Sequence, residues 1–276
     1  MWRRLETIHA AVYFAPELGE KFGEVGLKGF WMGYFAGRAA AFGPASPEVV
    51  LATFYNFHQS LVRRALPDAW SFATPEAVLR ARLEGAEIAL RRALGDEADS
   101  PEVAEAADLA AEAAHACSPE GRALFAAHAS LPWPDEPLPR LWHAATLLRE
   151  HRRAGPLPPL LANEVSGLES HLLIVGSGST TRELIQTARA WPDEDWDAAA
   201  SRLERRGLLD GDGRLTDTGR DLRARIEAPT DHLAAGPWEH LGAERTERLA
   251  ELVTPWARRV AEGIPYPNPM GLPQPD

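Results

Sequence analysis

Apolar residues recur at helical spacing along most of the chain, and runs of β-branched residues, which favour strands, are nearly absent. In the first half, a motif of hydroxyl residue, proline and glutamate recurs at 46–48, 74–76, 100–102 and 118–120. The hydroxyl can cap free backbone N–H groups, proline fits the first helical turn, and glutamate faces the positive end of the helix dipole. Each motif therefore predicts a helix start, and weaker versions at 15–17 and 191–193 predict two more.

Further along the chain, the pattern predicts a set of helices interrupted by a hairpin. Within 165–175, apolar residues fall at i, i+3, i+7 and i+10, which predicts a helix ending near Gly176. Three more helices are predicted at 180–191, 193–206 and 216–227. Between the last two, the turn composition Asp-Gly-Asp-Gly at 210–213 predicts a short β-hairpin. Three helices, a β wing and a helix form a winged helix-turn-helix.

Proline clusters predict the boundaries. Residues 131–139 hold four prolines and are expected to cross the surface as an extended, non-helical arm, and the cluster at 155–159 marks a domain junction. The predicted fold is all-α with a small β-hairpin wing. It comprises a multi-helical N-terminal domain at 1–155, a winged helix-turn-helix domain at 161–231, and a C-terminal helix with a proline-rich tail at 232–276. We expect the last helix, over 239–262, to pack on the N-terminal domain or on a second copy, and the tail to be disordered or laid along another surface.

Two stretches of residues carry a resemblance. The segment from Trp196 to Asp231, with its RRGLL, DGDGRLT and TDTGRDLRARIE motifs, resembles the winged domain of MarR-type transcriptional regulators. Over nearly its full length, the chain resembles a largely uncharacterised actinobacterial family in which a helical N-terminal region precedes such a domain. The matching motifs are FAPE at 14–17, GYFAGRAAAFGP at 33–44, ATFYNFH at 52–58, LPWPDEP at 131–137, LWHAATLLREHR at 141–152 and PNPMGL at 267–272.

The resemblance implies a fold and an assembly but no activity. It implies a winged helix in the second part and, as in MarR-type regulators, a homodimer. Relatives tend to follow LWHAATLLREHR with a glycine, acid and histidine motif, whereas this chain has Arg153-Ala154-Gly155-Pro156. A function that depends on that loop is therefore not expected here.

Charge argues against nucleic acid as a partner. The chain has 29 Lys plus Arg against 40 Asp plus Glu, a formal charge of -11. The expected recognition helix, 193–206, begins with Asp193, Glu194, Asp195 and Asp197, although this end of a recognition helix approaches the DNA phosphates. We therefore expect a degenerate winged helix that packs or dimerises and does not bind DNA.

Other compositional features narrow the function classes further. The single cysteine, Cys117, excludes an intramolecular disulfide framework and any multi-cysteine metal site, so the cytoplasm is the expected compartment. No apolar run is long enough for a membrane span, and the N-terminus does not have the pattern of a signal peptide. No spacing predicts a metal site, no nucleophile motif occurs, and no cofactor can be assigned.

The helical half concentrates polar side chains on apolar helix faces. His9 and Tyr13 are one turn apart, Trp31, Tyr34 and Arg38 share a face, and a wide apolar face expected along one helix over 48–62 carries Tyr55 and His58. His143 and Arg149 lie on the helix after Pro139. These positions lead us to predict a pocket lined by His9, Tyr13, Tyr34, Arg38, Tyr55, His58, His143 and Arg149.

Two explanations of these side chains stay open. In the structural one, they satisfy one another's hydrogen bonds and the aromatic rings are core. In the functional one, they line a cavity for a hydrophobic or aromatic small molecule with anionic character, because arginine beside aromatic walls suits a carboxylate. His9 or His58 could also ligate a haem-type metal or act as a general acid or base.

Three hypotheses follow from the sequence. The first is a cytoplasmic small-molecule-binding protein, with enzymatic activity left open, whose pocket lies in the N-terminal domain. The second is a ligand-responsive MarR-like transcriptional regulator. The third is a non-catalytic assembly module that carries no ligand.

Overall fold

The computed structural model describes residues 1–274, and nearly all its regular elements are helices. The first part of the chain forms α1 (Trp2–Phe14), α2 (Pro16–Glu24), α3 (Gly29–Ala39), η1 (Ala40–Phe42), α4 (Pro47–Phe54), α5 (Gln59–Arg63), α6 (Ala69–Phe72), α7 (Pro75–Leu94), η2 (Gly95–Asp99), α8 (Pro101–His115), α9 (Ala123–Ala129) and α10 (Pro137–Ala154). The remainder forms α11 (Leu157–Ala162), α12 (Gly167–Gly176), α13 (Arg182–Arg189), α14 (Asp193–Arg205), α15 (Asp217–Leu233), α16 (Gly236–Leu241) and α17 (Ala243–Ala261). The all-α prediction is confirmed. No helix in residues 1–274 is long and apolar enough to cross a membrane.

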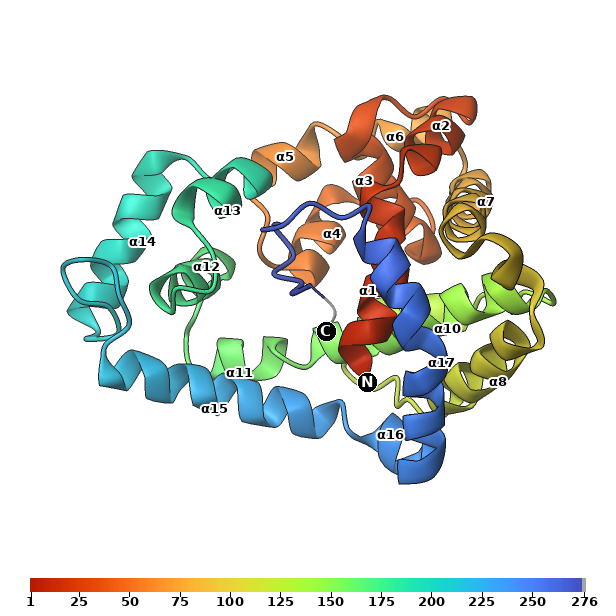
Figure 1. Cartoon of the computed structure of the whole chain (residues 1–276). Coiled ribbons are helices and arrows are strands. Elements are labelled where there is room, and N and C mark those ends of the chain that lie inside the picture. The colour runs from red at the N-terminus through yellow and green to blue at the C-terminus, as the bar shows by residue number, and fades with distance from the viewer. Residues whose placement is uncertain (275–276) are drawn as a thin grey trace.

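The helices enclose two hydrophobic cores. The larger core is built by α1–α10 together with α16, α17 and the C-terminal segment, and we call residues 1–155 and 236–274 the large unit. The smaller core is built by α11–α15, and we call residues 157–233 the small unit. Figure 1 shows the small unit beside the large one, with α13 next to α5 and α11 following α10. The chain therefore leaves the large unit once and returns to it through α15.

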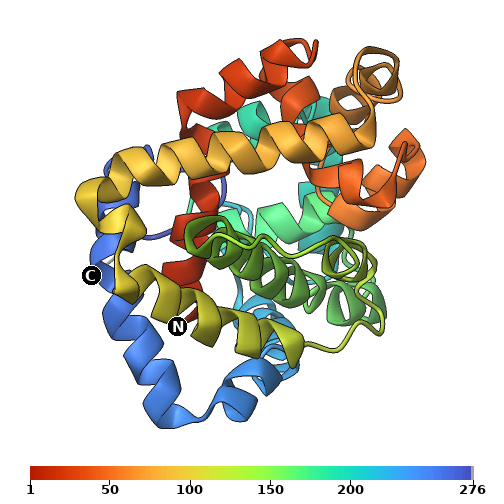
Figure 2. The same cartoon turned by 90° about the vertical axis from the view of Figure 1, so that its right-hand side faces the viewer.

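Within the large unit, α10 is the most deeply buried helix. It packs against α8 and α1, and its own side chains are buried along nearly its whole length. The C-terminal helix α17 lies against α1, α7 and α8, so it packs on the N-terminal part of its own chain. Figure 2 shows α7, α8 and α17 on the outer side of this unit.

Three of the four cap motifs start helices as predicted. The side chains of Ser46, Thr74 and Ser100 accept hydrogen bonds from backbone N–H groups three residues on, at the starts of α4, α7 and α8. The fourth prediction, at 118–120, is wrong. The Ser118 hydroxyl bonds to the Glu120 carboxylate, and Gly121 takes a positive φ of 71°, so α9 begins only at Ala123.

The proline-rich arm expected at 131–139 is shorter than predicted. Only 131–136 is non-helical, because α10 begins at Pro137 and includes Pro139 in its first turn. The first four N–H groups of a helix have no partner within the helix, so the missing donors of these prolines cost little there.

The single helix predicted over 48–62 is also wrong, since α4 and α5 are separated at Tyr55. Tyr55 has a φ of 66°, and residues 55–58 are non-helical. The segment instead contacts the small unit: the Tyr55 hydroxyl donates to the Val165 carbonyl at 2.5 Å, and the Trp191 indole N–H donates to the Asn56 carbonyl at 3.1 Å. Tertiary contacts thus override the helical apolar pattern.

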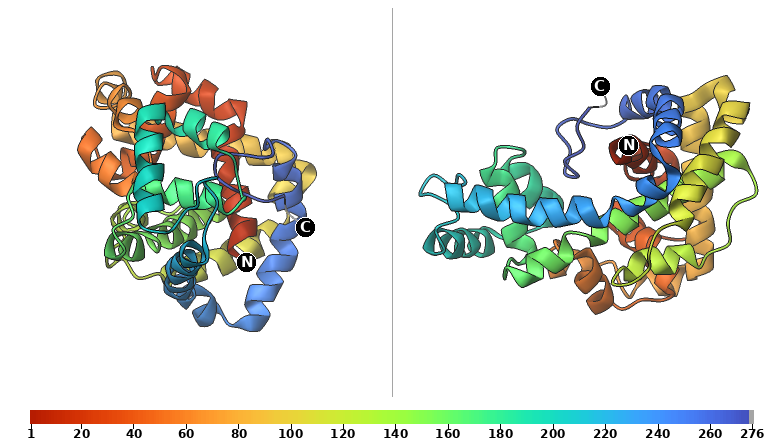
Figure 3. Two further views of the ribbon diagram at one scale, coloured as in Figure 1. Left: turned by 90° about the vertical axis from the view of Figure 1, so that its left-hand side faces the viewer. Right: turned by 90° about the horizontal axis from the view of Figure 1, so that it is seen from below.

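In the small unit, helices α12, α13, α14 and α15 form where the sequence predicts them. The stretch predicted as a hairpin is a loop closed by one antiparallel bridge between Leu209 and Leu215. Asp210 N–H donates to the Arg214 carbonyl within this loop at 2.9 Å. Helix α15 continues to Leu233, beyond the predicted end at 227, and Figure 3 shows it reaching from the small unit to the large one.

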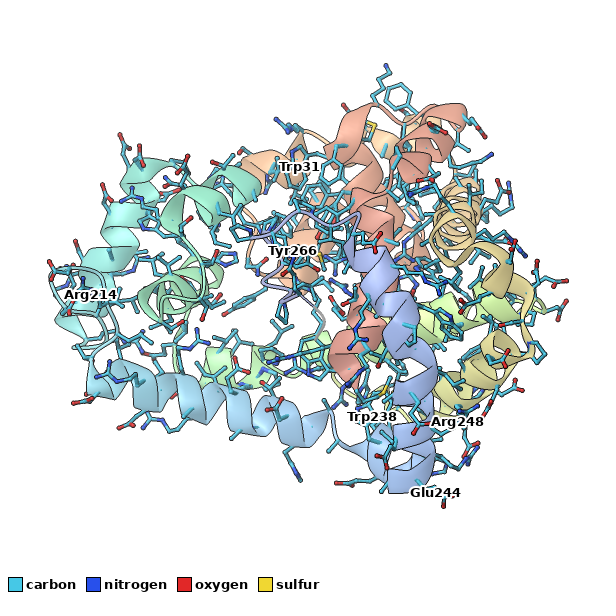
Figure 4. The ribbon with its side chains drawn as sticks, in the orientation of Figure 1. Trp31, Arg214, Trp238, Glu244, Arg248 and Tyr266 are labelled. Carbon is cyan, nitrogen blue, oxygen red and sulfur yellow. The ribbon has the colours of Figure 1, made fainter. Side chains whose placement is uncertain are left out.

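The C-terminal region differs from the prediction in one respect. The helix expected over 239–262 is divided into α16 and α17 by Gly242, whose φ is 82°. The tail to residue 274 lies along another surface, one of the two predicted alternatives. Asn268 and Leu272 are buried, and the Pro269 carbonyl accepts from Arg189 of α13 at 2.8 Å. Figure 4 shows Tyr266 of this tail between the small unit and α17.

Candidate functional site

A buried polar cluster occupies the interior of the large unit, where α1, α3, α7 and α10 meet. Five of the eight sequence-predicted site residues belong to it. Its members are Glu6, His9, Tyr13, Tyr34, Arg38, Arg82, Arg149 and Glu150. Charged side chains at this depth need partners, since an unpaired buried charge is costly.

Glu150 is the carboxylate that two of the arginines share. Arg38 and Glu150, 1% and 2% exposed, form an ion pair with Nη2–Oε1 and Nη2–Oε2 distances of 3.2 and 3.3 Å. Arg149 donates to the same carboxylate and to Glu6 at 3.0 Å. Burial alone raises the pKa of Glu150, but Arg38 and Arg149 outweigh burial and hold it well below its usual range. Glu150 is therefore ionised at neutral pH.

Arg82, contributed by α7, is bonded differently. It is 3% exposed, its Nη2 lies 3.4 Å from His9 Nε2, and its guanidinium lies 4.6 Å from the Trp142 ring centre. No carboxylate in residues 1–274 is within ion-pair distance of it. Burial lowers the pKa of Arg82 to about 10, so it stays charged at neutral pH. Burial, with Arg149 and Arg82, holds the pKa of His9 well below its usual value, so His9 is neutral and Nε2 can accept from Arg82.

A pocket of about 310 Å³ adjoins this cluster between α1, α2, α3 and α7. Its polar wall consists of Tyr13, Tyr34, Arg38 and Arg82. The Tyr13 hydroxyl and Arg38 Nε are buried without a hydrogen-bond partner among the described residues. Unsatisfied buried groups of this kind cost about 1–3 kcal/mol each, and a ligand that bonds to them removes that cost.

Two glycines of α3 shape another part of the wall. A Cβ added at Gly33 or Gly37 would lie 2.6 or 2.7 Å from ring atoms of Phe22. The absence of side chains at these positions lets the Phe22 ring pack directly on the α3 backbone and form a flat apolar surface. The pocket lining therefore combines aromatic and cationic side chains.

Tyr55 and His58 do not reach this pocket. Both lie in the break between α4 and α5, where Tyr55 bonds to Val165 and His58 caps α5. His58 Nε2 lies 3.6 Å from Asp195 of α14, and its ring packs on Trp191. These two residues join the units together.

His143 also lies outside the pocket. It is 6% exposed and packs edge-on against Trp133, with ring centres 4.8 Å apart. Burial, with Arg82 and His115, lowers the pKa of His143 to about 4, so it is neutral at neutral pH. The sequence correctly predicts that it is internal, but not that it faces the Trp133 loop.

Arg82 is the principal pocket residue that the sequence analysis missed. A signal for it exists, because Val78, Arg82, Gly85 and Ala89 fall at i, i+4, i+7 and i+11 and all are buried. An arginine inside a stripe of small and apolar residues is a candidate buried cation. The exposed Arg80, two positions away, belongs to another face.

His9 and His58, either of which the sequence leaves open as a ligand of a haem-type metal, do not lie together. No group of three or more His, Cys, Asp or Glu side chains in the described part of the chain is placed to hold a metal ion. His9 and His58 belong to different regions, the first inside the polar cluster and the second at the boundary between the units. A site for a metal cofactor is therefore not assigned.

In the small unit, α13 and α14 are arranged as a helix-turn-helix, with α14 on the outer face (Figure 3). The first turn of α14 carries Asp193, Glu194 and Asp195, all exposed. Arg182 of α13 forms ion pairs with Asp193 at 2.8 Å and Asp197 at 2.9 Å. The end of the helix that would approach DNA is therefore acidic, and its nearest arginine is already paired.

Comparison with known proteins identifies the family to which the chain belongs. No curated protein and no solved structure matches the chain. A model of a helix-turn-helix family matches residues 1–267, which include the small unit, nearly all of the large unit and the first part of the tail. Because the match covers nearly the whole length and the α13–α14 arrangement agrees with it, the chain belongs to this helix-turn-helix family.

Proposed function

We propose that the protein binds a small, largely hydrophobic molecule in the pocket between α1, α2, α3 and α7. One observation carries the proposal: Tyr13, whose buried hydroxyl no described residue satisfies, is one of the residues that line this pocket. The unpartnered Nε of Arg38 at the same wall supports it. Buried polar groups beside an aromatic-walled cavity are the usual composition of a small-molecule site.

We further propose that the small unit is a degenerate winged helix of the MarR type, with the loop closed at Leu209 and Leu215 as a shortened wing. In this proposal it does not bind DNA through α14. The exposed acids of the first turn of α14 would face phosphates, and like charges there turn the usual electrostatic attraction into repulsion. We also propose that the protein forms a homodimer, as MarR-type regulators do.

Membership of a helix-turn-helix family favours a second candidate, a ligand-responsive transcriptional regulator. An electrophoretic mobility-shift assay at low salt, with the DNA that flanks the protein's own gene, separates the two. Our proposal predicts no shifted band at micromolar protein. A shifted band that is specific for the DNA sequence and disappears when a ligand is added would contradict our proposal and support a transcriptional regulator.

The binding proposal is tested by native mass spectrometry of the protein as purified, followed by organic extraction. Gly19 lines the pocket on α2, and a Cβ there meets nothing within 4 Å, so Gly19→Leu adds bulk at the pocket without a backbone clash. Gly23 is on the same helix with equally open space but does not line the pocket, which makes Gly23→Leu the matched control.

We expect the wild type and Gly23→Leu to carry a small molecule that Gly19→Leu has lost. If the purified wild type is empty, the same three proteins are compared by thermal shift against a compound library. Equal occupancy of Gly19→Leu and the wild type, or a wild type that no compound stabilises, would contradict the proposal.

A further inference from the structure

The pocket wall contains one positive charge that the surrounding carboxylates do not balance. The carboxylates of the cluster are both engaged by its other two arginines. Among the described residues, Arg82 has no carboxylate partner, and its guanidinium lies beside the neutral His9 imidazole and the Trp142 ring. Since a buried guanidinium without a counter-charge is costly, a ligand with one negative charge would stabilise Arg82.

The phenol of Tyr34 indicates a positive potential in the same place. Burial alone raises the pKa of Tyr34, but Arg38, Arg189 and Arg153 outweigh burial, so its pKa lies below its ordinary value. A potential that favours phenolate over phenol also favours a carboxylate over an uncharged ligand. The polar end of the pocket is therefore suited electrostatically to an anion.

Residues that line the pocket carry hydrogen-bond donors suited to that anion. Arg82 and Tyr13 both line the pocket, and the Tyr13 hydroxyl has no partner in residues 1–274. A carboxylate accepts several hydrogen bonds at once, and bonds from arginine to a carboxylate are stronger than those between neutral groups. No acidic side chain lines the pocket to compete for these donors.

The other residues of the pocket wall indicate the chemistry of the rest of the ligand, to which the anionic group is attached. Its other side chains are apolar or aromatic, with Phe14, Leu18, Phe22 and Phe30 as the largest. The volume of about 310 Å³ is at the small end of ligand pockets, so it fits a short apolar body, and the flat Phe22 face favours a ring or a chain without branches.

We propose that this pocket takes an apolar monocarboxylate whose carboxylate is held by Arg82 and the Tyr13 hydroxyl, with its apolar body against Phe22. The assignment rests on the proposed function and adds the class of headgroup. A single charge fits because, of the two arginines that line the pocket, Arg38 is paired with Glu150 and only Arg82 has no carboxylate partner among the described residues.

Three molecules of one shape test the headgroup. Isothermal titration calorimetry of the full-length protein at pH 7.5 compares 4-phenylbutyrate, 4-phenyl-1-butanol and 4-phenylbutylamine. We expect the carboxylate to bind about tenfold or more tightly than the alcohol, because a charged hydrogen bond is the difference between them. The amine should bind most weakly, since its cation approaches Arg82.

Variants on the same helix identify the residue responsible. Arg82→Gln should bind the carboxylate and the alcohol equally, whereas Arg82→Lys should keep most of the preference. Arg80→Gln, at an exposed position of α7, is the matched control and should behave as the wild type. Tyr13→Phe should weaken carboxylate binding by about threefold to tenfold and keeps the test valid if Arg82→Gln does not fold.

The outcomes separate this inference from the proposed function. If the alcohol or the amine binds as tightly as the carboxylate, or if Arg82→Gln keeps the preference, the carboxylate inference is wrong and the pocket remains a ligand site. Failure of all three molecules to bind the wild type also overturns the inference. The proposed function is contradicted separately, by Gly19→Leu retaining the ligand or by a wild type that binds no compound.

Discussion

Glu150 is the residue on which the buried charge cluster depends. It is 2% exposed and lies between two arginines that are also buried. Because all three side chains are out of water, each charge is stabilised by its neighbours and not by solvent. Removing one charge therefore affects more than one ion pair.

We predict that Glu150→Gln destabilises the protein by about 3–5 kcal/mol, because it leaves Arg38 and Arg149 with less counter-charge in the interior. Urea unfolding followed by circular dichroism measures this change. Glu105→Gln removes an exposed ion pair with Arg248 and should leave the urea midpoint almost unchanged. Equal midpoints for the two variants would show that the buried cluster does not stabilise the fold.

Buried histidines predict how stability depends on pH. Burial, with Arg82, lowers the pKa of His128 to about 3, whereas an unfolded histidine titrates near 6.5. Between these two pKa values the unfolded state binds more protons than the folded state. The stability that His128 contributes as a neutral buried residue is therefore complete above about pH 6.5 and is lost as the pH falls toward 3.

For His128 the loss amounts to about 2 kcal/mol between pH 6.5 and pH 5. We predict that His128→Gln reduces the fall in unfolding free energy over this interval by about that amount. Urea titrations at the two pH values measure it. His232→Gln, at an exposed position, is the control, and the same pH slope in all three proteins would refute the assignment.

At the scale of elements, helical spacing predicts the pocket faces of α1 and α3 but not the break between α4 and α5. His9 with Tyr13, and Tyr34 with Arg38, share faces that follow from a 3.6-residue repeat. At residues 55–58 the apolar repeat continues, yet contacts with the small unit hold the backbone out of the helix. Contacts between distant segments are not encoded in the local spacing.

The same reason explains why Arg82 is difficult to predict. Helix α7 contains several arginines, and its apolar stripe distinguishes only which face is buried. The position of Glu150 on α10 determines which arginine has a carboxylate partner: Arg38 has one and Arg82 does not. The pocket was therefore predictable in its location on α1 and α3, but its charge balance was not.

The contact between α12 and the α4–α5 segment yields a prediction at this scale. A Cβ on Gly167 would lie 2.0 Å from the Tyr55 carbonyl oxygen, too close for any side chain. We predict that Gly167→Ala costs about 1–3 kcal/mol and speeds proteolysis between the units, because the close approach must be lost. Gly211→Ala, where a Cβ meets nothing within 4 Å, is the control. Unchanged cleavage rates in Gly167→Ala would contradict this view of the boundary.

Across the whole molecule, a row of side chains connects the pocket to the small unit. Tyr34 of the pocket packs on Phe57 with ring centres 5.6 Å apart, and Arg189 of α13 lies 4.5 Å from the Phe57 ring. Arg189 in turn donates to the Pro269 carbonyl of the tail at 2.8 Å. The tail therefore holds the end of α13 in place beside the large unit.

We predict that Asn268→Ala loosens this connection. Asn268 is 2% exposed, accepts from the Met270 and Leu272 N–H groups at 3.1 Å, and donates to the Leu272 carbonyl at 3.0 Å, so its side chain sets the tail's conformation. Hydrogen exchange should rise about tenfold in α13 and stay unchanged in α8. Gln274→Ala at the exposed tail end serves as the control. Equal exchange of α13 in both variants would mean that the tail does not restrain it.

The most direct test of the account is a crystal structure of the protein with the small molecule that it carries or with 4-phenylbutyrate. We expect ligand density between α1, α2, α3 and α7, with a polar group within hydrogen-bond distance of the Tyr13 hydroxyl. Density at a different place, with this pocket closed by its own side chains, would contradict it.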